Sequence, residues 1–319
     1  MDVSIVVPLF NEEESLPELC AWIDRVALSN QFSYEIILVD DGSYDTSWKV
    51  IESLAEANGN IKGIKFQRNY GKSAALNEGF RVVTGEVVIT MDADLQDIPD
   101  EIPGLRKMIL EEDFDLVSGW KKIRHDPASK TIPSKFFNWV TQKSTGIRLH
   151  DFNCGLKAYR REVVKSIDLY GEMHRYIPVI AKWNGFSRIG EKVVEHRPRK
   201  YGVTKFGLDR FLFGFLDLLS ITFVSKYIKR PMHFFGTLGV LSFLLGTAIA
   251  VTLILEKINT LARGLRARNV TEQPLFFLAL VAIVVGVQLF TAGFLGEMMV
   301  INTRRTHDYL IAERVGLPE

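Results

Sequence analysis

The chain is organised around residues 87–97, which read Val87-Val88-Ile89-Thr90-Met91-Asp92-Ala93-Asp94-Leu95-Gln96-Asp97. The first five residues are mostly apolar and rich in β-branched side chains, which predicts a buried strand that runs directly into Asp92 and Asp94. Ligands of open α/β folds bind at the carboxyl ends of parallel strands. Two neighbouring carboxylates suit Mg²⁺ or Mn²⁺, so we hypothesise a metal site there. For an isolated Asp-x-Asp pair, a solvated acidic turn before the next helix is the simpler interpretation.

Strand and helix patterns alternate on both sides of this stretch. Short apolar runs predict strands at 3–8, 35–39, 61–66, 87–91 and 114–119, with a later one at 189–195. Helical spacing of apolar residues predicts helices near 16–26, 48–55, 73–84 and, after Pro99 and Pro103, in the following segment. Because short links join alternating strands and helices, we predict an α/β fold with a mainly parallel, doubly wound sheet.

Polar residues follow three of the predicted strands. They are Asn11 and Glu12, Asp40 and Asp41, and Asp92 and Asp94. A hydrophobic core needs none of these side chains, whereas a nucleotide site uses several. A GxGxxG motif is missing after the first strand, which disfavours a dinucleotide-binding fold, and the sequence lacks the GxxxxGK[ST] motif of P-loop NTPases.

The composition sets further bounds. The 39 Lys and Arg residues nearly cancel the 38 Asp and Glu residues, so the charge balance does not suggest a nucleic-acid partner. Hydrophobic residues make up 47% of the chain, and the excess lies after residue 205. Cys20 and Cys154 are too few for a disulfide framework, which fits a reducing compartment, and we expect both to be ordinary buried or half-buried thiols.

Two segments after the predicted strands are basic. Residues 121–135 are polar and cationic, as in a solvated loop, but beside a diphosphate such cations would also bind an anionic acceptor. Residues 196–207 combine cations with Gly202 and Gly207, so this loop could close on a phosphate. A juxtamembrane basic cluster is the alternative for the second segment.

The apolar residues near the C-terminus predict a membrane part. Residues 208–227 mix apolar and charged side chains, which is typical of a helix in the membrane interface. Residues 231–255 and 274–299 are each long enough to span a bilayer. Small residues four apart, such as Ala282 and Gly286, would let two spans pack closely. Two buried core helices are the alternative, but the rest of the chain offers nothing to surround them.

The polar motifs bring a family resemblance. The runs VSIVVPLFNEE, ILVDDGSYD, NYGKSAALNEGF and MDADLQDIP resemble the GT-A (Rossmann-like) catalytic domain of inverting family 2 glycosyltransferases. This resemblance implies nucleotide-sugar binding by the following residues: Pro8, Asn11, Glu12, Asp40, Asp41, Lys72 and Asp92. It also implies that Asp92, Asp94 and Gln96 hold Mg²⁺ or Mn²⁺.

Two further segments resemble the same enzymes. Residues 150–161 are similar to the family segment in which an Asp faces the acceptor and the sugar, which implies a catalytic role for Asp151. Asp94 of the metal motif is the second predicted catalytic residue. Residues 199–205 match the Arg-x-x-Gly-x-Ser/Thr-Lys loop of polyisoprenyl-phosphate glycosyltransferases. The implied binding site for the acceptor phosphate consists of Lys122, Arg124, Arg199, Thr204 and Lys205.

The resemblance covers nearly the whole chain and implies four parts. They are a catalytic domain at 1–206, interface helices at 207–230, two transmembrane helices at 231–302 and a cytoplasmic tail at 303–319. Because the N-terminus enters a predicted strand at once and nucleotide sugars are made in the cytosol, we expect a multi-pass protein of the inner (plasma) membrane with a cytoplasmic catalytic domain.

The implied activity is hexose transfer, with inversion, from a nucleotide diphosphate sugar to undecaprenyl (polyprenyl) phosphate. UDP-glucose is the first choice of donor, followed by GDP-mannose or a modified aminoarabinose donor. A processive polysaccharide synthase is an alternative, although the sequence lacks the Gln-x-x-Arg-Trp motif of such enzymes. Two non-enzymatic alternatives are a nucleotide-sugar sensor and a transporter. With two spans per chain, a transporter would require a homo-oligomer.

Overall fold

The computed structural model describes residues 1–122, 141–143, 145–169, 171, 173–198, 200, 231–302 and 311–316. These residues form two compact units, one built from the N-terminal 200 residues together with 311–316 and the other from 231–302. The predicted interface helices and four of the predicted acceptor-phosphate residues, Arg124, Arg199, Thr204 and Lys205, lie outside the described residues.

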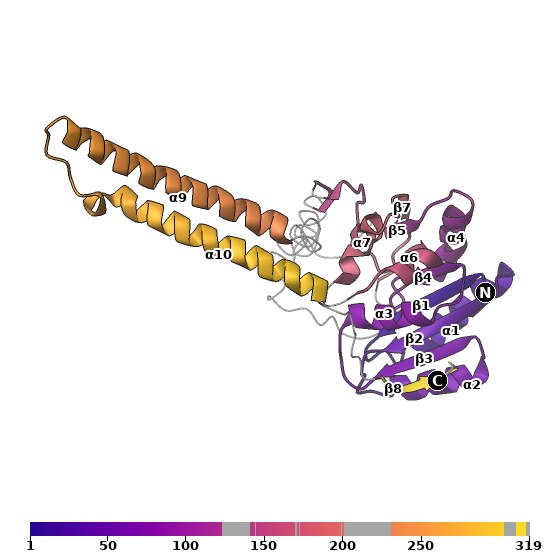
Figure 1. The fold of residues 1–319 in the computed structure, drawn as a ribbon. Helices are drawn as coiled ribbons and strands as arrows, with labels where there is room; N and C mark the ends of the chain where they lie inside the picture. The colour runs from indigo at the N-terminus through magenta and orange to yellow at the C-terminus, as the bar shows by residue number, and fades with distance from the viewer. Residues whose placement is uncertain are drawn as a thin grey trace. The chain divides into compact units, whose positions relative to one another are not determined.

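The first unit contains an eight-stranded sheet with the order β7-β5-β6-β4-β1-β2-β3-β8 (Figure 1). The strands are β1 Val3–Leu9, β2 Tyr34–Asp40, β3 Ile61–Phe66, β4 Val87–Thr90, β5 Leu116–Trp120, β6 Lys157–Arg160, β7 Ile189–Val193 and β8 Ile311–Val315. β1 pairs in parallel with β2 and β4, as do β2 with β3 and β5 with β7. The predicted mainly parallel α/β sheet is therefore confirmed.

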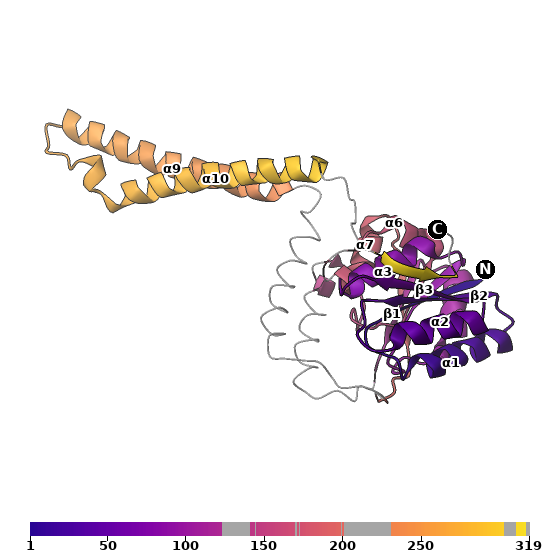
Figure 2. The ribbon, with the colours of Figure 1, turned by 90° about the horizontal axis from the view of Figure 1, so that it is seen from below.

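Helices cover both faces of this sheet, as Figure 2 shows for α1 and α2 on one side and α3 on the other. The helices and 3-10 turns of this unit are α1 Leu16–Ser29, α2 Ser47–Ala57, α3 Lys72–Val82, η1 Pro99–Glu101, α4 Ile102–Leu110, α6 Arg161–Ser166, η2 Met173–Tyr176 and α7 Ile177–Trp183. Alternate residues of β2 enter two separate cores. Ile36 and Leu38 pack with α1, α2 and α4, while Ile37 and Val39 pack with α3, α6 and α7.

The antiparallel strands β6 and β8 were not predicted. β6 lies between β4 and β5, and its first residue, Lys157, pairs with Thr90 at the end of β4. The loop before β6 therefore reaches the same edge of the sheet as the loops after β1, β2 and β4. β8 pairs with β3, so part of the predicted C-terminal tail belongs to the sheet of the first unit.

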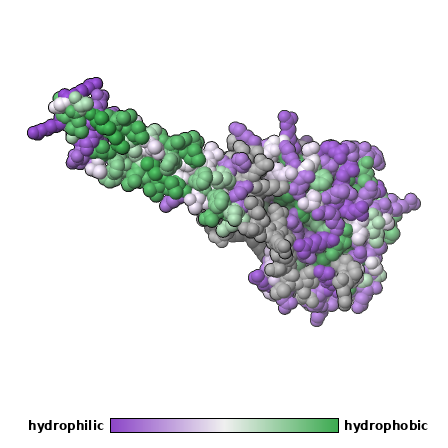
Figure 3. Space-filling model, in the orientation of Figure 1, coloured by the Kyte–Doolittle hydropathy of each residue, from purple (hydrophilic) through white to green (hydrophobic). Residues whose placement is uncertain are grey.

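The second unit is a hairpin of two long apolar helices, α9 Pro231–Ala262 and α10 Pro274–Asn302, joined through η3 Val270–Glu272. Figure 3 shows hydrophobic side chains along its surface. Both helices are long and apolar enough to cross a membrane, and the apolar 18-residue windows within them have mean hydropathies of 2.4 and 2.5. The helices approach closely at glycines: a Cβ placed on Gly286 would lie 2.6 Å from the Phe243 nitrogen, and one on Gly246 would lie 2.6 Å from the Ala279 oxygen. Small residues therefore form the contact between the two helices, as predicted.

Candidate active site at the carboxyl edge of the sheet

The loop after β1 is bonded to the loop after β2. The Asn11 amide donates to Ser43 Oγ (2.9 Å), and the Tyr44 amide donates to Asn11 Oδ1 (2.8 Å). The Glu12 amide donates to Ser47 Oγ (3.0 Å). These bonds place the predicted nucleotide-binding residues of both loops next to one another.

The acidic pair at the end of β2 is buried. The Asp41 carboxylate accepts bonds from the amides of Tyr70 (2.7 Å) and Gly71 (2.9 Å), which join it to the start of α3. Burial raises the pKa of Asp41 to about 6, although these amide bonds oppose the shift. Burial also raises the pKa of Asp40, whose Oδ1 accepts the Ser43 amide. Asp40 Oδ2 is buried and has no hydrogen-bond donor among the described residues.

The loop after β4 presents Asp92 to Lys72, the first residue of α3. The Lys72 ammonium forms an ion pair with Asp92 Oδ1. Burial would raise the pKa of Asp92, but Lys72 and then Lys121 outweigh it and lower the pKa to about 2. Asp92 is therefore a carboxylate at any physiological pH. Because the Asp41-bound Gly71 precedes Lys72, the acidic ends of β2 and β4 meet through the start of α3.

Asp97 bonds to the backbone of this loop and pairs with Lys121. Asp97 is 1% exposed, and its Oδ2 accepts the Asp92 amide (3.2 Å). Its Oδ1 pairs with Lys121 Nζ (2.9 Å), and this partner raises the pKa of Lys121 against the effect of burial. Sequence analysis treated Lys121 only as part of a basic loop, and it did not single out Asp97.

The predicted metal ligands fit a divalent ion that is bound together with substrate phosphates. Asp92, Asp94 and Gln96 follow β4 closely, and Asp94 Oδ1 accepts the Gln96 amide (3.2 Å). Among the residues that the structure describes, no group of three His, Cys, Asp or Glu side chains could enclose a metal. Mg²⁺ is commonly held by one or two carboxylates, waters and phosphates. The Lys72 ammonium pairs with Asp92 in this structure, so the Asp92 carboxylate already binds a cation.

Asp151, the predicted catalytic residue, lies in the loop before β6. It is 2% exposed, its Oδ1 accepts the Asn153 amide (3.0 Å), and its own amide donates to Glu191 Oε1 (3.2 Å). Since β6 runs antiparallel to β4, this loop lies at the edge that carries Asp92. The side chain is fixed by the turn that it forms.

The predicted acceptor-phosphate residues are described only in part. Lys122 is exposed, with its ammonium 5.9 Å from the centre of the Trp120 ring. Arg124, Arg199, Thr204 and Lys205 lie outside the described residues. The segment just before Arg199 contacts the metal motif, because the Arg197 amide donates to the Gln96 carbonyl (3.1 Å) and His196 forms a bridge with Asp97.

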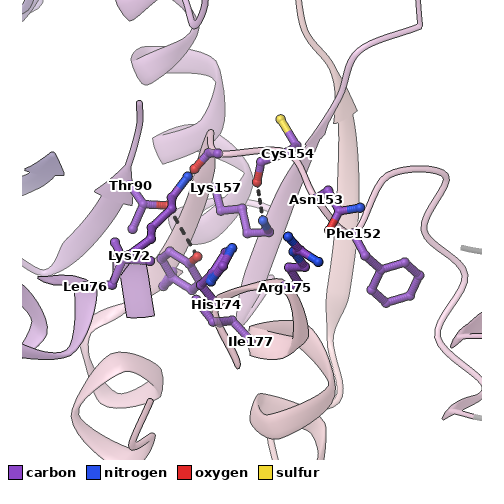
Figure 4. A pocket seen from close by; sticks show the side chains of 12 residues that line it. Lys72, Leu76, Thr90, Phe152, Asn153, Cys154, Lys157, His174, Arg175 and Ile177 are labelled. Carbon is purple, nitrogen blue, oxygen red and sulfur yellow. Dashed lines mark hydrogen bonds between the residues drawn. The ribbon is translucent and has the colours of Figure 1, made fainter. Parts of the chain in front are cut away.

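Two nitrogen groups in this region were not predicted, the buried Lys157 and the half-buried His174. Lys157 begins β6 and is 3% exposed, and His174 lies in η2 with its Nδ1 3.0 Å from Ser73 Oγ. Both line a small pocket that also contacts Lys72 (Figure 4). The strand that Lys157 begins was not predicted, and His174 comes from a segment with no strand or helix pattern. The predicted burial of the Cys20 and Cys154 thiols is confirmed, and burial raises the pKa of each to about 12.

Comparison with known proteins agrees with this geometry. Residues 4–168 match the family model described as glycosyl transferase family 2. The chain is 37% identical over 302 residues to dodecaprenyl-phosphate galacturonate synthase of Rhizobium johnstonii, covering 94% of this chain and 88% of the relative. It is also 37% identical over 301 residues to undecaprenyl-phosphate 4-deoxy-4-formamido-L-arabinose transferase of Shewanella sediminis, covering 92% and 86%.

Solved structures share the fold at lower identity. Mannosyl-3-phosphoglycerate synthase of Rubrobacter xylanophilus aligns with a TM-score of 0.57 and 18% identity, covering 71% of this chain and 75% of that one. Glucosyl-3-phosphoglycerate synthase of Mycobacterium tuberculosis, crystallised with Mn²⁺, UDP-glucose and phosphoglyceric acid, aligns with a TM-score of 0.53 and 18% identity over 70% and 79%. The family match and the similarity to relatives over nearly the whole chain show that this protein is a glycosyltransferase and belongs to glycosyl transferase family 2.

Proposed function

We propose that this protein transfers a sugar from a nucleoside diphosphate sugar to polyprenyl phosphate at a membrane. The observation that carries the proposal is the meeting of the buried acidic pair of β2 with Lys72 and Asp92 at one sheet edge. Relatives that match over nearly the whole chain are named as transferases or synthases acting on undecaprenyl or dodecaprenyl phosphate. The two apolar helices would hold the enzyme where such a lipid acceptor resides.

The β2 end of the edge suits the nucleoside. Asp40 Oδ2 is buried and receives no hydrogen bond from the part of the chain that the structure describes, and an N–H of a base would satisfy it. Asn11, Glu12 and the half-buried Pro8 border the same loops and would enclose the base and ribose. UDP is our first choice of nucleotide.

The β4 end suits the diphosphate. Asp92, with Asp94 and Gln96, would hold Mg²⁺ or Mn²⁺, and such an ion neutralises the charge that grows on a leaving diphosphate. When a metal and a diphosphate occupy the site, the Lys72 ammonium is free to exchange Asp92 for a phosphate oxygen. Lys72 would thereby add a charge-assisted bond to the leaving group.

The proposed reaction is a single displacement. An oxygen of the acceptor phosphate forms a bond to the anomeric carbon while the bond from that carbon to the β-phosphate oxygen breaks. The electron pair leaves with the nucleoside diphosphate, and the configuration inverts. Since the second pKa of a phosphate monoester is ~6, the nucleophile is already ionised at neutral pH and needs no general base. Asp151, fixed by its bond from the Asn153 amide, would orient the sugar or stabilise positive charge at its anomeric carbon.

The acceptor phosphate needs cations, because it approaches a donor that is itself anionic. Lys122 and the predicted residues Arg124, Arg199, Thr204 and Lys205 would supply this binding site. Arg199 comes two residues after Arg197 in the sequence, and the Arg197 amide donates to the Gln96 carbonyl of the metal motif. We propose that the catalytic domain lies on the cytoplasmic side of the inner membrane, because nucleotide sugars are made in the cytosol. In this arrangement Mg²⁺ or Mn²⁺ and both substrates reach the site from the cytosol and the membrane surface.

A transfer assay tests this function. The full chain in bilayers would be incubated with undecaprenyl phosphate and a panel of radiolabelled nucleotide sugars that includes UDP-glucose, GDP-mannose, UDP-uronates and an aminoarabinose donor. We expect one lipid-linked monosaccharide, whose formation requires the divalent ion. A polymer would indicate a processive synthase instead. Binding of a nucleotide sugar without turnover on any lipid phosphate would show a sensor and refute the transferase.

A further inference from the structure

A small pocket near Asp92 is lined by several basic side chains. It is bordered by Lys72, Lys157, His174 and Arg175, together with Asn153 and the backbone at Gly155. None of the described residues that line it is an Asp or a Glu. Figure 4 shows the side chains of Lys157, His174 and Arg175 pointing into this space. We call it the cationic pocket.

Lys157 is the unusual member of the pocket. It is 3% exposed, and its ammonium donates to the Cys154 carbonyl. Burial, helped by repulsion from Lys72, lowers the pKa of Lys157. Among the described residues the Lys157 ammonium forms no ion pair, and the charges of Asp151 and Asp92 offset only part of the cost of burying it. An apolar side chain would serve the strand better, so the position points to an anionic ligand.

His174 adds a donor to the same space. Its backbone amide donates to Ser73 Oγ (2.9 Å), and its Nδ1 lies 3.0 Å from that oxygen. Burial, followed by the nearby charge of Lys72, lowers the pKa of His174 well below its usual value, so the ring is neutral. A hydroxyl that donates to Nδ1 leaves the ring proton on Nε2, where it can bond a ligand oxygen.

The pocket adjoins the proposed donor site. Lys72 lines it and also bonds Asp92, and Thr90, the residue that pairs with Lys157 across the sheet, donates to the Gly155 carbonyl (2.8 Å). A sugar on a diphosphate held at Asp92 would therefore have its ring beside the pocket. A substituent of that sugar enters together with the donor. A lipid phosphate would instead have to bring its long chain to the same small pocket.

We propose that the cationic pocket receives a carboxylate of the donor sugar, so that the preferred substrate is the nucleotide derivative of a hexuronic acid. The inference rests on the proposed function. Lys157 and Arg175 would bond the carboxylate oxygens, and His174 would add a neutral donor. The carboxylate takes no part in the displacement at the anomeric carbon. A neutral hydroxymethyl group at the same carbon would leave the Lys157 ammonium uncompensated.

Matched donor pairs test this specificity on the wild-type chain. UDP-galacturonate and UDP-galactose, like UDP-glucuronate and UDP-glucose, differ only in a carboxylate against a hydroxymethyl group at C6. We expect kcat/KM to favour a uronate by at least tenfold over its neutral partner. Calorimetric titration without lipid should likewise give a lower Kd for each uronate than for its neutral partner. Equal or stronger use of the neutral sugars would overturn the inference while leaving the proposed function intact, whereas failure to bind or transfer any sugar would overturn both.

Variants then assign the preference to the pocket. Lys157→Met should reduce the uronate preference at least tenfold, both in Kd and in kcat/KM, with little change for the neutral donor. Lys165→Met is the matched control, because Lys165 Nζ also donates to a backbone carbonyl, that of Arg81, but on the surface. Arg175→Gln gives an independent test if Lys157→Met does not fold. A raised KM for polyprenyl phosphate with unchanged donor affinity would show that the pocket takes the lipid phosphate, and it would overturn the assignment to the sugar.

Discussion

Gly155 lies against the carboxylate of Asp92: a Cβ placed on Gly155 would be 2.6 Å from Asp92 Cγ and 2.6 Å from its Oδ2. No side chain can occupy position 155 unless Asp92 moves. Gly155→Ala should therefore displace the Asp92 carboxylate from the position set by Lys72. Because small misplacements of reacting groups are costly, we expect sugar transfer to fall by roughly tenfold or more. Steady-state rates and Mn²⁺ affinity would be measured on the same preparation.

The control for this variant is Gly59→Ala, because a Cβ on Gly59 would meet nothing within 4 Å. It should keep normal rates and a normal Tm. If Gly155→Ala binds Mn²⁺ and transfers sugar as well as Gly59→Ala does, Asp92 does not need its observed position.

The carboxylate of Asp92 should itself be essential. Asp92→Asn removes the charge that pairs with Lys72 and that would attract Mg²⁺ or Mn²⁺. We expect transfer to be lost and Mn²⁺ binding, followed by electron paramagnetic resonance with UDP present, to weaken strongly. Asp94→Asn should act in the same direction. Glu86→Gln, an exposed carboxylate elsewhere in the domain, is the comparison. Normal turnover of Asp92→Asn in EDTA would refute the metal site.

The stability of the catalytic domain should depend on pH through Asp41. Burial raises its pKa from the ordinary value of 3.8 to about 6, so the folded state holds this proton more tightly than the unfolded state. The resulting stabilisation is present at low pH and is lost as the pH rises through about 6. Between pH 5 and pH 8 this group alone should lower the free energy of unfolding by roughly 1 kcal/mol.

Asp41→Asn isolates the effect, because the amide cannot titrate and can still accept the Tyr70 amide. The Tm of the wild type should fall by ~2–4 °C more than that of the variant across this pH range. Parallel pH profiles of the two proteins would mean that Asp41 ionises normally in the fold.

The acidic ends of the strands were predictable because each depends on a local pattern. A buried strand followed at once by Asp40 or Asp92 requires only neighbouring residues, and parallel pairing then brings the strand ends together. The cationic pocket depends instead on Lys72, Lys157 and His174, which belong to α3, β6 and η2. Their convergence follows from the antiparallel insertion of β6 between β4 and β5.

The strands β6 and β8 escaped prediction for a related reason. β6 spans Lys157–Arg160 and carries a cation at each end, so its short sequence does not alternate between apolar and polar residues. β8 follows a long apolar helix, and a pattern of a few residues after such a segment is also typical of a tail. Both segments become strands because they pair with strands that lie far away in the sequence, β6 with β4 and β8 with β3.

The hairpin of α9 and α10 should depend on its glycines. A Cβ on Gly286 would lie 2.6 Å from the Phe243 nitrogen and 2.7 Å from the Gly239 oxygen, and these backbone atoms cannot move aside singly. Gly286→Ala should therefore separate the helices and lower the SDS fraction at which the hairpin unfolds in mixed micelles. Gly236→Ala is the control, because its Cβ would meet only the flexible Met232 side chain, at 3.1 Å. Equal unfolding of both variants would show that close packing at Gly286 contributes nothing.

The C-terminal strand should stabilise the catalytic domain through Glu313. One carboxylate oxygen accepts the Trp48 indole N–H (2.7 Å) and the other pairs with Lys65 Nζ (3.0 Å), so β8 is joined to both α2 and β3. Glu313→Ala leaves the indole of a side chain that is only 6% exposed without its acceptor. We expect a loss of roughly 1–3 kcal/mol in the free energy of unfolding. Arg314→Ala alters the same strand at an exposed position and should have little effect. The two variants are compared by thermal unfolding of the full chain in detergent. If they melt together, the Glu313 contacts do not hold the strand, and the backbone pairing of β8 with β3 alone keeps the C-terminus on the sheet.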